Sequence, residues 1–259
     1  GHSNSFSALL ELLDPQRFVR GVPVDSKLRD TVMVRRLKSD LRAIGEKFPK
    51  RNVGRIEIDR LPADAPELVL SELLQRFRVA RGERLSGASK TQQASAMLVV
   101  IALQKRLLSS IEAFARTLDV HRRSMLTTAK KAPEVSTRNL DLLYNTPDGD
   151  DERSELPEDE VEREEDAQMA AATAQSTADA TALGPEFALL DEMARIARAA
   201  RYDADPRVRH LLDWIRKNQC PDLGKEGAAW KPRRVLIFTE YADTKRYLQQ
   251  LLADRIRTS

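Results

Sequence analysis

The stretch Arg233-Arg234-Val235-Leu236-Ile237-Phe238-Thr239-Glu240-Tyr241-Ala242-Asp243-Thr244 decides how this chain is interpreted. Four apolar residues follow a basic pair, a run long enough for one buried strand. After this run, apolar residues recur at helical spacing from Tyr247 to Leu252. The pattern predicts a strand that leads directly into an amphipathic helix. This order is typical of the first unit of a parallel α/β domain. Because a parallel strand cannot bury both faces alone, we expect either docking on absent segments or a chain that is a fragment.

Composition predicts a mainly α fold, a helical bundle or insertion that carries this small α/β element. The chain has 259 residues, of which 41% are hydrophobic, 32% charged and only 5% aromatic. Abundant arginine and leucine with scarce glycine favour helices over sheet. The single cysteine, Cys220, excludes an intramolecular disulfide framework and is interpreted as an ordinary thiol. Without a signal peptide or a membrane-length apolar run, we expect a cytoplasmic protein with no membrane partner.

The acidic charge of the chain is concentrated in one stretch. Residues 148–166 hold twelve acidic and two basic residues, although the formal net charge of the chain is +3. The remainder is therefore basic, which suits a polyanion such as nucleic acid, unless the arginines simply lie on solvated helix faces. Residues 146–183, acidic and then rich in alanine, indicate a linker or surface insert that is either partly helical or partly disordered. The alternative for the acidic run is a nucleic-acid mimic.

Helical spacing of apolar residues recurs along most of the chain. It predicts helices over residues 5–13, 25–41, 67–84, 90–123, 187–200 and 205–217. Asp205 before Pro206 is a suitable start for the last of these helices. Residues 52–59 alternate in polarity and indicate a strand with one wet face.

The longest pattern, Lys90 to Arg123, is typical of a helix packed in a bundle rather than of a ligand site. The face opposite its apolar stripe carries basic residues, namely Lys105, Arg106, Arg116, Arg122 and Arg123.

No complete active site is evident in the sequence. Gly224-Lys225 lacks the earlier glycine and the hydroxyl residue of a phosphate-binding loop. The histidines at positions 2, 121 and 210 lack a metal-ligand spacing, and no Gly-x-Ser-x-Gly elbow occurs. We therefore expect that the chain alone catalyses nothing and binds no cofactor by itself.

Two blocks in the right order resemble Swi/Snf-type ATPases of helicase superfamily 2. Met33–Leu41, with Phe48–Arg51 and the residues up to Ile58, resembles the family's "LRR-K-D... LP-K" segment. Arg233–Leu252 resembles the first strand and helix of the C-terminal helicase lobe, and Asp205–Val208 resembles the helix before it, with Arg207 for the usual lysine. The bacterial HepA/RapA-like branch is the most similar, and residues 1–18 resemble Swi/Snf-like helicases of DISARM phage-defence systems. The resemblance covers less than half of the chain.

This resemblance implies that the chain runs from just after the third helicase motif to just inside the second RecA-like lobe. The implied order is as follows: the end of the first lobe and a crossover helix (1–50), a strand of the second lobe (51–60), a helical inter-lobe domain (61–145), the linker or insert (146–183), a helical return (184–222) and the start of the C-terminal lobe (223–259).

The resemblance further implies an ATP-dependent translocase on double-stranded DNA. ATP and magnesium would be bound by the parent protein, because the family's ATP lysine, Asp-Glu box and arginine motif have no counterpart here. DNA and the rest of the helicase lobes are the implied partners, with defence-system or polymerase subunits beside them. The residues that the resemblance makes DNA-facing or lobe-coupling are Arg35, Arg36, Lys38, Thr239, Glu240 and Tyr241.

Two alternatives stay open at this point. Arg35 and Arg36 could form salt bridges between lobes instead of contacting phosphates. The whole chain could instead be a stand-alone helical adaptor that binds protein or nucleic acid.

Overall fold

The computed structural model describes residues 3–45, 47, 51–130, 156–177 and 183–256. Of these residues 66% are helical and none belongs to a strand, which confirms the mainly α prediction. The chain forms two compact units, one made of the described residues up to Glu57 and one of those from Ile58 onwards. No helix among the described residues is long and apolar enough to cross a membrane.

The first unit holds three short helices, α1 (Ser3–Leu13), α2 (Ser26–Val32) and α3 (Lys38–Ala43). The single helix predicted over residues 25–41 is wrong, because the backbone is extended between α2 and α3. Asp25 caps the first of these helices, and the Asp40 side chain accepts a hydrogen bond from the Leu37 backbone at 2.9 Å. Asp40 thus starts a new helix where the apolar spacing predicted a continuous one. Residues 48–50 of the resembling block lie outside the described residues.

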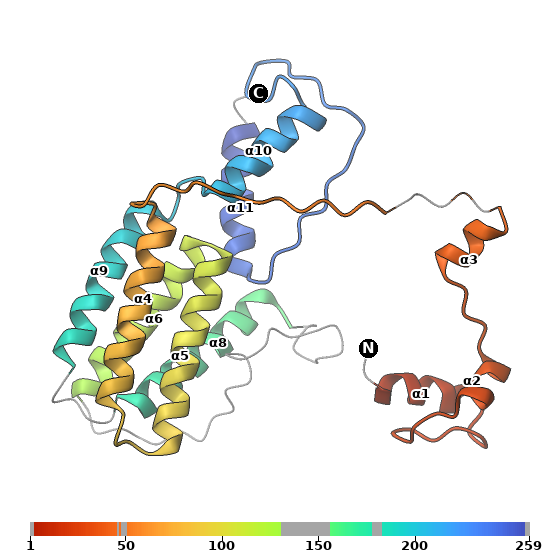
Figure 1. Ribbon diagram of the computed structural model, residues 1–259, viewed down its shortest axis with the longest axis horizontal. Helices are drawn as coiled ribbons and strands as arrows, with labels where there is room; N and C mark the ends of the chain where they lie inside the picture. Colours follow the sequence, from red (N-terminus) through yellow and green to blue (C-terminus); the bar gives the residue numbers. More distant parts are fainter. Residues whose placement is uncertain (1–2, 46, 48–50, 131–155, 178–182, 257–259) are drawn as a thin grey trace. The chain divides into compact units, whose positions relative to one another are not determined.

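The second unit contains a five-helix bundle of α4 (Pro66–Arg84), α5 (Lys90–Ser109), α6 (Ile111–Lys130), α8 (Glu158–Ser176) and α9 (Gly184–Ala200), packed side by side (Figure 1). Local signals set the helix starts: Pro66 occupies the first turn of α4, and Ser89 caps α5 in a capping box with Gln92. Apolar side chains of all five helices form one core, with Phe77, Leu103 and Phe114 fully buried.

Two places in the bundle bear on the predictions. The expected helix over residues 90–123 is broken at Ser110, which is extended (φ −164°, ψ 156°) and whose hydroxyl accepts a hydrogen bond from the Ala113 N–H at 3.1 Å. Within the linker or insert predicted for 146–183, residues 158–176 form α8, which is the helical alternative for this stretch. Its small side chains allow close packing, and Ala172 and Thr173 are fully buried. Residues 146–155 and 178–182 of that prediction lie outside the described residues.

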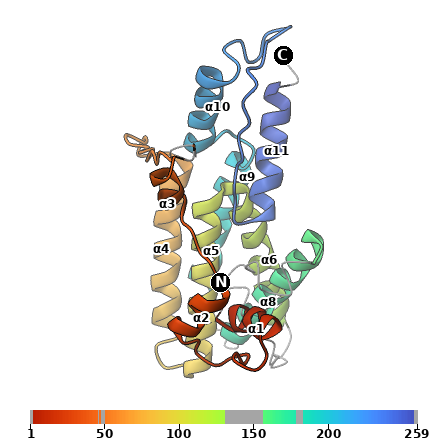
Figure 2. The same cartoon turned by 90° about the vertical axis from the view of Figure 1, so that its right-hand side faces the viewer.

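Two more helices, α10 (Pro206–Asn218) and α11 (Ala242–Ile256), lie together at one end of the bundle (Figure 2). Asp205 caps α10 as predicted, accepting a hydrogen bond from the Val208 N–H at 2.9 Å. These helices share a second core with the loop after α10, and the core contains Val208, Leu212, Ile215, Cys220, Leu223 and Tyr247.

The two predicted strands, over residues 52–59 and 235–238, are not formed in the described part of the chain. Both segments lack an α-helical or β-ladder hydrogen-bond pattern, and the predicted buried strand is largely exposed, with Leu236 at 81% and Phe238 at 89%. A strand is stabilised by pairing with a neighbour, and no described residue supplies one.

Candidate functional site

The bundle and the α10–α11 pair meet through polar groups. Their hydrophobic cores share no residue, and α11 contacts the bundle at α6. We call this contact the polar joint. On the bundle it consists of Arg106, Ser109, Ser110, Arg116, Glu162 and Glu165, and on the α11 side of Tyr241, Asp243, Thr244 and Arg246.

Arg106 of α5 lies at the centre of the polar joint. Its Nη2 donates to Glu165 Oε2 at 2.7 Å, and its Nη1 donates to Thr117 Oγ1 at 3.2 Å. The guanidinium carbon also lies 4.2 Å from the centre of the Tyr241 ring, a cation–π distance. The sequence pattern put Arg106 on the face opposite the apolar stripe. The structure buries it to 8% exposure, because α8 brings a carboxylate to that face.

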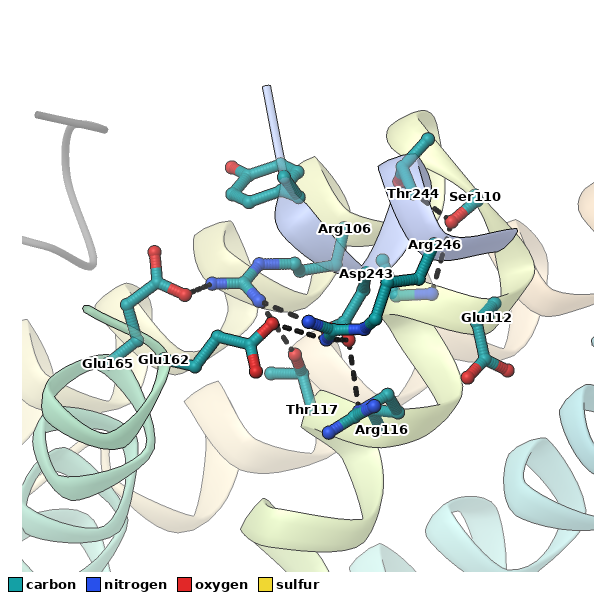
Figure 3. A network of polar contacts seen from close by, with 12 residues as sticks. Arg106, Ser110, Glu112, Arg116, Thr117, Glu162, Glu165, Asp243, Thr244 and Arg246 are labelled. Atoms are coloured by element: carbon teal, nitrogen blue, oxygen red, sulfur yellow. Dashed lines mark hydrogen bonds and ion pairs between the residues drawn. The ribbon is translucent and has the colours of Figure 1, made fainter. Parts of the chain in front are cut away.

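Three arginines lie around the carboxylate of Asp243, which is in the first turn of α11 (Figure 3). Its carboxylate oxygens lie 2.5 Å from Arg246, 3.0 Å from Arg116 and 4.0 Å from Arg106. Burial raises the pKa of Asp243, and the positive charge of Arg116 acts against that rise. The pKa of Glu165 is raised by burial in the same way, with Arg106 opposing. The arginines therefore offset the desolvation of two carboxylates, and removing one of them leaves a costly buried charge.

Hydroxyl groups fix α11 to the corner between α5 and α6. Thr244 Oγ1 lies 2.7 Å from Ser109 Oγ and 2.8 Å from Ser110 Oγ. The break at Ser110, which the sequence did not predict, thus places the hydroxyls of Ser109 and Ser110 against α11. Arg207 of α10 also donates to the Leu108 carbonyl, so both helices of the pair contact this corner.

Acidic residues of α8 complete the contact from the other side. Glu158 pairs with Lys245, and Glu162 pairs with Arg246. Part of the acidic stretch therefore forms ion pairs with basic residues of α11, so it is not simply a solvated run of charges. At the same place, a cavity of about 150 Å³ is lined by Arg116, Arg123, Asp166 and other residues of the contact.

Of the six predicted site residues, Tyr241 belongs to the polar joint, and Thr239 and Glu240 precede it in the chain. Tyr241 is 7% exposed, and burial raises the pKa of its phenol to about 12. The Tyr241 N–H donates to Thr239 Oγ1 at 3.4 Å, which turns the chain into α11. Thr239 and Glu240 line a cavity of about 320 Å³ together with Asp205, Arg207 and other residues of α10 and α11.

The other three predicted residues belong to the first unit. Arg35 and Arg36 lie in the extended segment after α2, and Lys38 begins α3. All three side chains are exposed, and none forms an ion pair with a described residue. The salt-bridge alternative for Arg35 and Arg36 thus has no partner in the part of the chain that the structure describes.

The polar joint holds helices together through ion pairs and hydroxyl groups. No group of three or more His, Cys, Asp or Glu side chains within the described ranges is placed to hold a metal ion. Cys220 is fully buried in the second core. No protein-family model, curated protein or solved structure matches this chain.

Proposed function

We propose that this chain is the inter-lobe segment of an ATP-dependent double-stranded DNA translocase of the Swi/Snf type. In this proposal α11 is the first helix of the second lobe, and the five-helix bundle links it to the first lobe. One observation carries the proposal: α11 is attached to the bundle through ion pairs of the buried Asp243 and through hydroxyls, while its apolar core is shared with α10 and the loop after α10.

A polar contact of this kind suits a moving connection. Interfaces between domains of one chain are more polar than permanent interfaces, and relative motion across them is the default expectation. Ion pairs also fix direction and partner more than they add stability. The polar joint can therefore hold α11 in one register against Ser109 and Ser110 and still exchange partners during a cycle.

The segment before α11 supports the same proposal. Leu236, Ile237 and Phe238 are exposed although they are large and apolar. Exposed apolar residues that are contiguous mark surfaces that another element covers. A neighbouring strand of the proposed second lobe would pair with this segment and bury it.

DNA contact is assigned to Arg35, Arg36 and Lys38. Their exposed and unpaired charges are available to phosphates, which bind lysine and arginine without regard to sequence. ATP and Mg²⁺ are assigned to residues of the translocase that match the family's ATP lysine and Asp-Glu box.

The DNA assignment is tested by fluorescence anisotropy with a labelled duplex over a range of salt concentrations. Replacing Arg35, Arg36 and Lys38 by alanine should weaken binding equally for different sequences. It should also reduce the slope of log K against log salt by up to about 0.9 for each lost phosphate contact. The matched control replaces three exposed arginines of the other unit, Arg76, Arg195 and Arg209. An unchanged slope in the first variant would remove these residues from the DNA interface.

A stand-alone adaptor is the second candidate. It is favoured by the bundle's core, which is complete without any residue of α10 or α11. The two candidates differ in the reading frame that encodes the chain. A phosphate-binding loop in that frame and DNA-stimulated ATP hydrolysis by its product support the translocase, whereas their absence supports the adaptor.

A further inference from the structure

A groove of about 340 Å³ lies on the bundle between α4 and α5, far in sequence from the polar joint residues of α11. The two helices are neighbours joined by a short loop (Figure 1). One wall of the groove is apolar and consists of Leu85, Ala96, Met97 and Val100. Leu85, Ala96 and Val100 are buried, whereas Met97 is 47% exposed at the rim. The wall therefore offers an apolar surface to a ligand that enters from solvent.

The charged residues that line the groove are both arginines. Arg78 is exposed and forms no ion pair within the described residues, and Arg81 is 1% exposed. Arg81 Nε lies 3.8 Å from Glu186 Oε2, which is too far for a hydrogen bond, and this nitrogen has no hydrogen-bond partner in the described structure. The other two nitrogens of the Arg81 guanidinium contact His121 Nε2 at 3.1 Å and Ser176 Oγ at 2.7 Å. Glu186 also pairs with Arg84, so one carboxylate serves two guanidinium groups. The groove consequently has an excess of positive charge and no acidic lining residue.

The loop between the two helices is held in place beside the groove. The Gln93 side-chain amide donates to the carbonyls of Leu85 at 3.1 Å and Ala88 at 3.2 Å, and so fixes the loop between the helices. Gly82 lines the groove, and a Cβ added there would meet no atom within 4 Å. A side chain at position 82 would thus occupy space that is now available to a ligand.

We propose that this groove binds a small amphipathic anion, an aliphatic chain that ends in a carboxylate or a phosphate. The chain lies on the apolar wall, where burial of methylene groups drives binding. The head group lies beside the exposed guanidinium of Arg78, because arginine forms strong charge-assisted hydrogen bonds with both kinds of oxyanion. The buried Arg81 contributes its positive charge and no hydrogen bond to the ligand. The site is separate from the proposed translocase function and stands or falls without it.

Isothermal titration calorimetry with octanoate tests the proposal on the full chain. We expect saturable binding of one octanoate with a negative heat-capacity change, the marker of apolar burial. Octylamine, which has the same tail and the opposite charge, should bind at least about tenfold more weakly, because it meets two arginines. Octyl phosphate distinguishes the two head groups: tighter binding than octanoate assigns the site to phosphates, and weaker binding assigns it to carboxylates.

Two variants locate the site. Gly82→Leu fills the groove from an exposed helix position and should abolish octanoate binding. Arg78→Gln removes the exposed cation and should weaken binding by about tenfold or more. The control is Arg76→Gln, an exposed arginine of the same helix that does not line the groove. No binding by the unmodified chain, equal binding of octylamine, or full binding by Gly82→Leu with native circular dichroism would each overturn the proposal.

Discussion

At the scale of single residues, the least expected feature is a chain of polar groups inside the bundle. Arg81 Nη1 donates to His121 Nε2 at 3.1 Å, so the imidazole carries its proton on Nδ1 and donates to Thr173 Oγ1 at 2.7 Å. The Thr173 hydroxyl then donates to the Met169 carbonyl at 2.7 Å. His121 is fully buried, and burial, with the neighbouring Arg81 charge, lowers its pKa well below the ordinary value. His121 is therefore a neutral structural group. The lack of a metal-ligand spacing around it in the sequence agrees with this role.

This feature predicts how stability depends on pH. The folded state keeps His121 neutral, while the unfolded chain binds a proton below a pKa of about 6.5. The free energy of unfolding should therefore fall as the pH falls through that value, by up to about 1.4 kcal/mol per pH unit. His121→Gln retains an acceptor and a donor but cannot titrate, so it should lose this part of the dependence. Urea unfolding at pH 5, 6 and 7 measures it.

The variant is compared with the unmodified chain because other groups titrate nearby in pH. Burial raises the pKa of Glu165, Asp166 and Asp243, which makes the folded state bind protons more readily and gives the opposite slope at lower pH. These carboxyls are present in both proteins, so the difference isolates His121. Identical pH dependence in the two proteins would show that His121 is not kept neutral.

At the scale of elements, the sequence predicted helices where their start signals are local. Pro66 and the Asp205–Pro206 pair mark helix starts that the structure confirms. Ser110 was missed because its break is stabilised by partners far along the chain, among them Thr244. The sequence left helix α8 as one of two alternatives and did not predict its place in the bundle, because its acidic and alanine-rich sequence has little apolar bulk. Only packing among other helices makes its small residues a buried face. The strand over residues 235–238 failed for the converse reason, since its pattern requires a partner strand.

Because ion pairs contribute to the polar joint, we predict that high salt weakens the attachment of α11 more than the packing of the five bundle helices. The Debye length falls from about 10 Å at 0.1 M salt to about 3 Å at 1 M, which weakens ion pairs and leaves apolar burial intact. Hydrogen exchange should therefore become severalfold faster for amides at the start of α11 at 1 M sodium chloride. Amides in the middle of α4 and α5 serve as the internal reference. Uniform acceleration, or none, would mean that ion pairs do not hold α11.

At the scale of the whole chain, the sequence predicted where the charges lie along the chain but not which charged residues pair with one another. The sequence showed an acidic stretch beside a basic remainder, and the structure pairs Glu158, Glu162 and Glu165 of that stretch with three basic residues. Arg106 is thereby buried, and the charges of Lys245 and Arg246 are balanced by neighbouring glutamates. This pairing could not be predicted from the sequence, because it joins segments that only folding brings together. The exposed group at positions 35, 36 and 38 retains its charge for a polyanion.

The central claim is that the bundle couples the second lobe of a DNA translocase through the polar joint. It is tested by measuring duplex-stimulated ATP hydrolysis and translocation together on the product of the complete reading frame. Asp243→Asn removes the charge that three arginines share, and Asp213→Asn, an exposed aspartate of α10, is the matched control. We predict that Asp243→Asn keeps DNA-stimulated hydrolysis but moves at least about tenfold fewer base pairs per ATP, because α11 is no longer held to the bundle through this charge. Hydrolysis that DNA does not stimulate, or equal coupling in both variants, would contradict the claim.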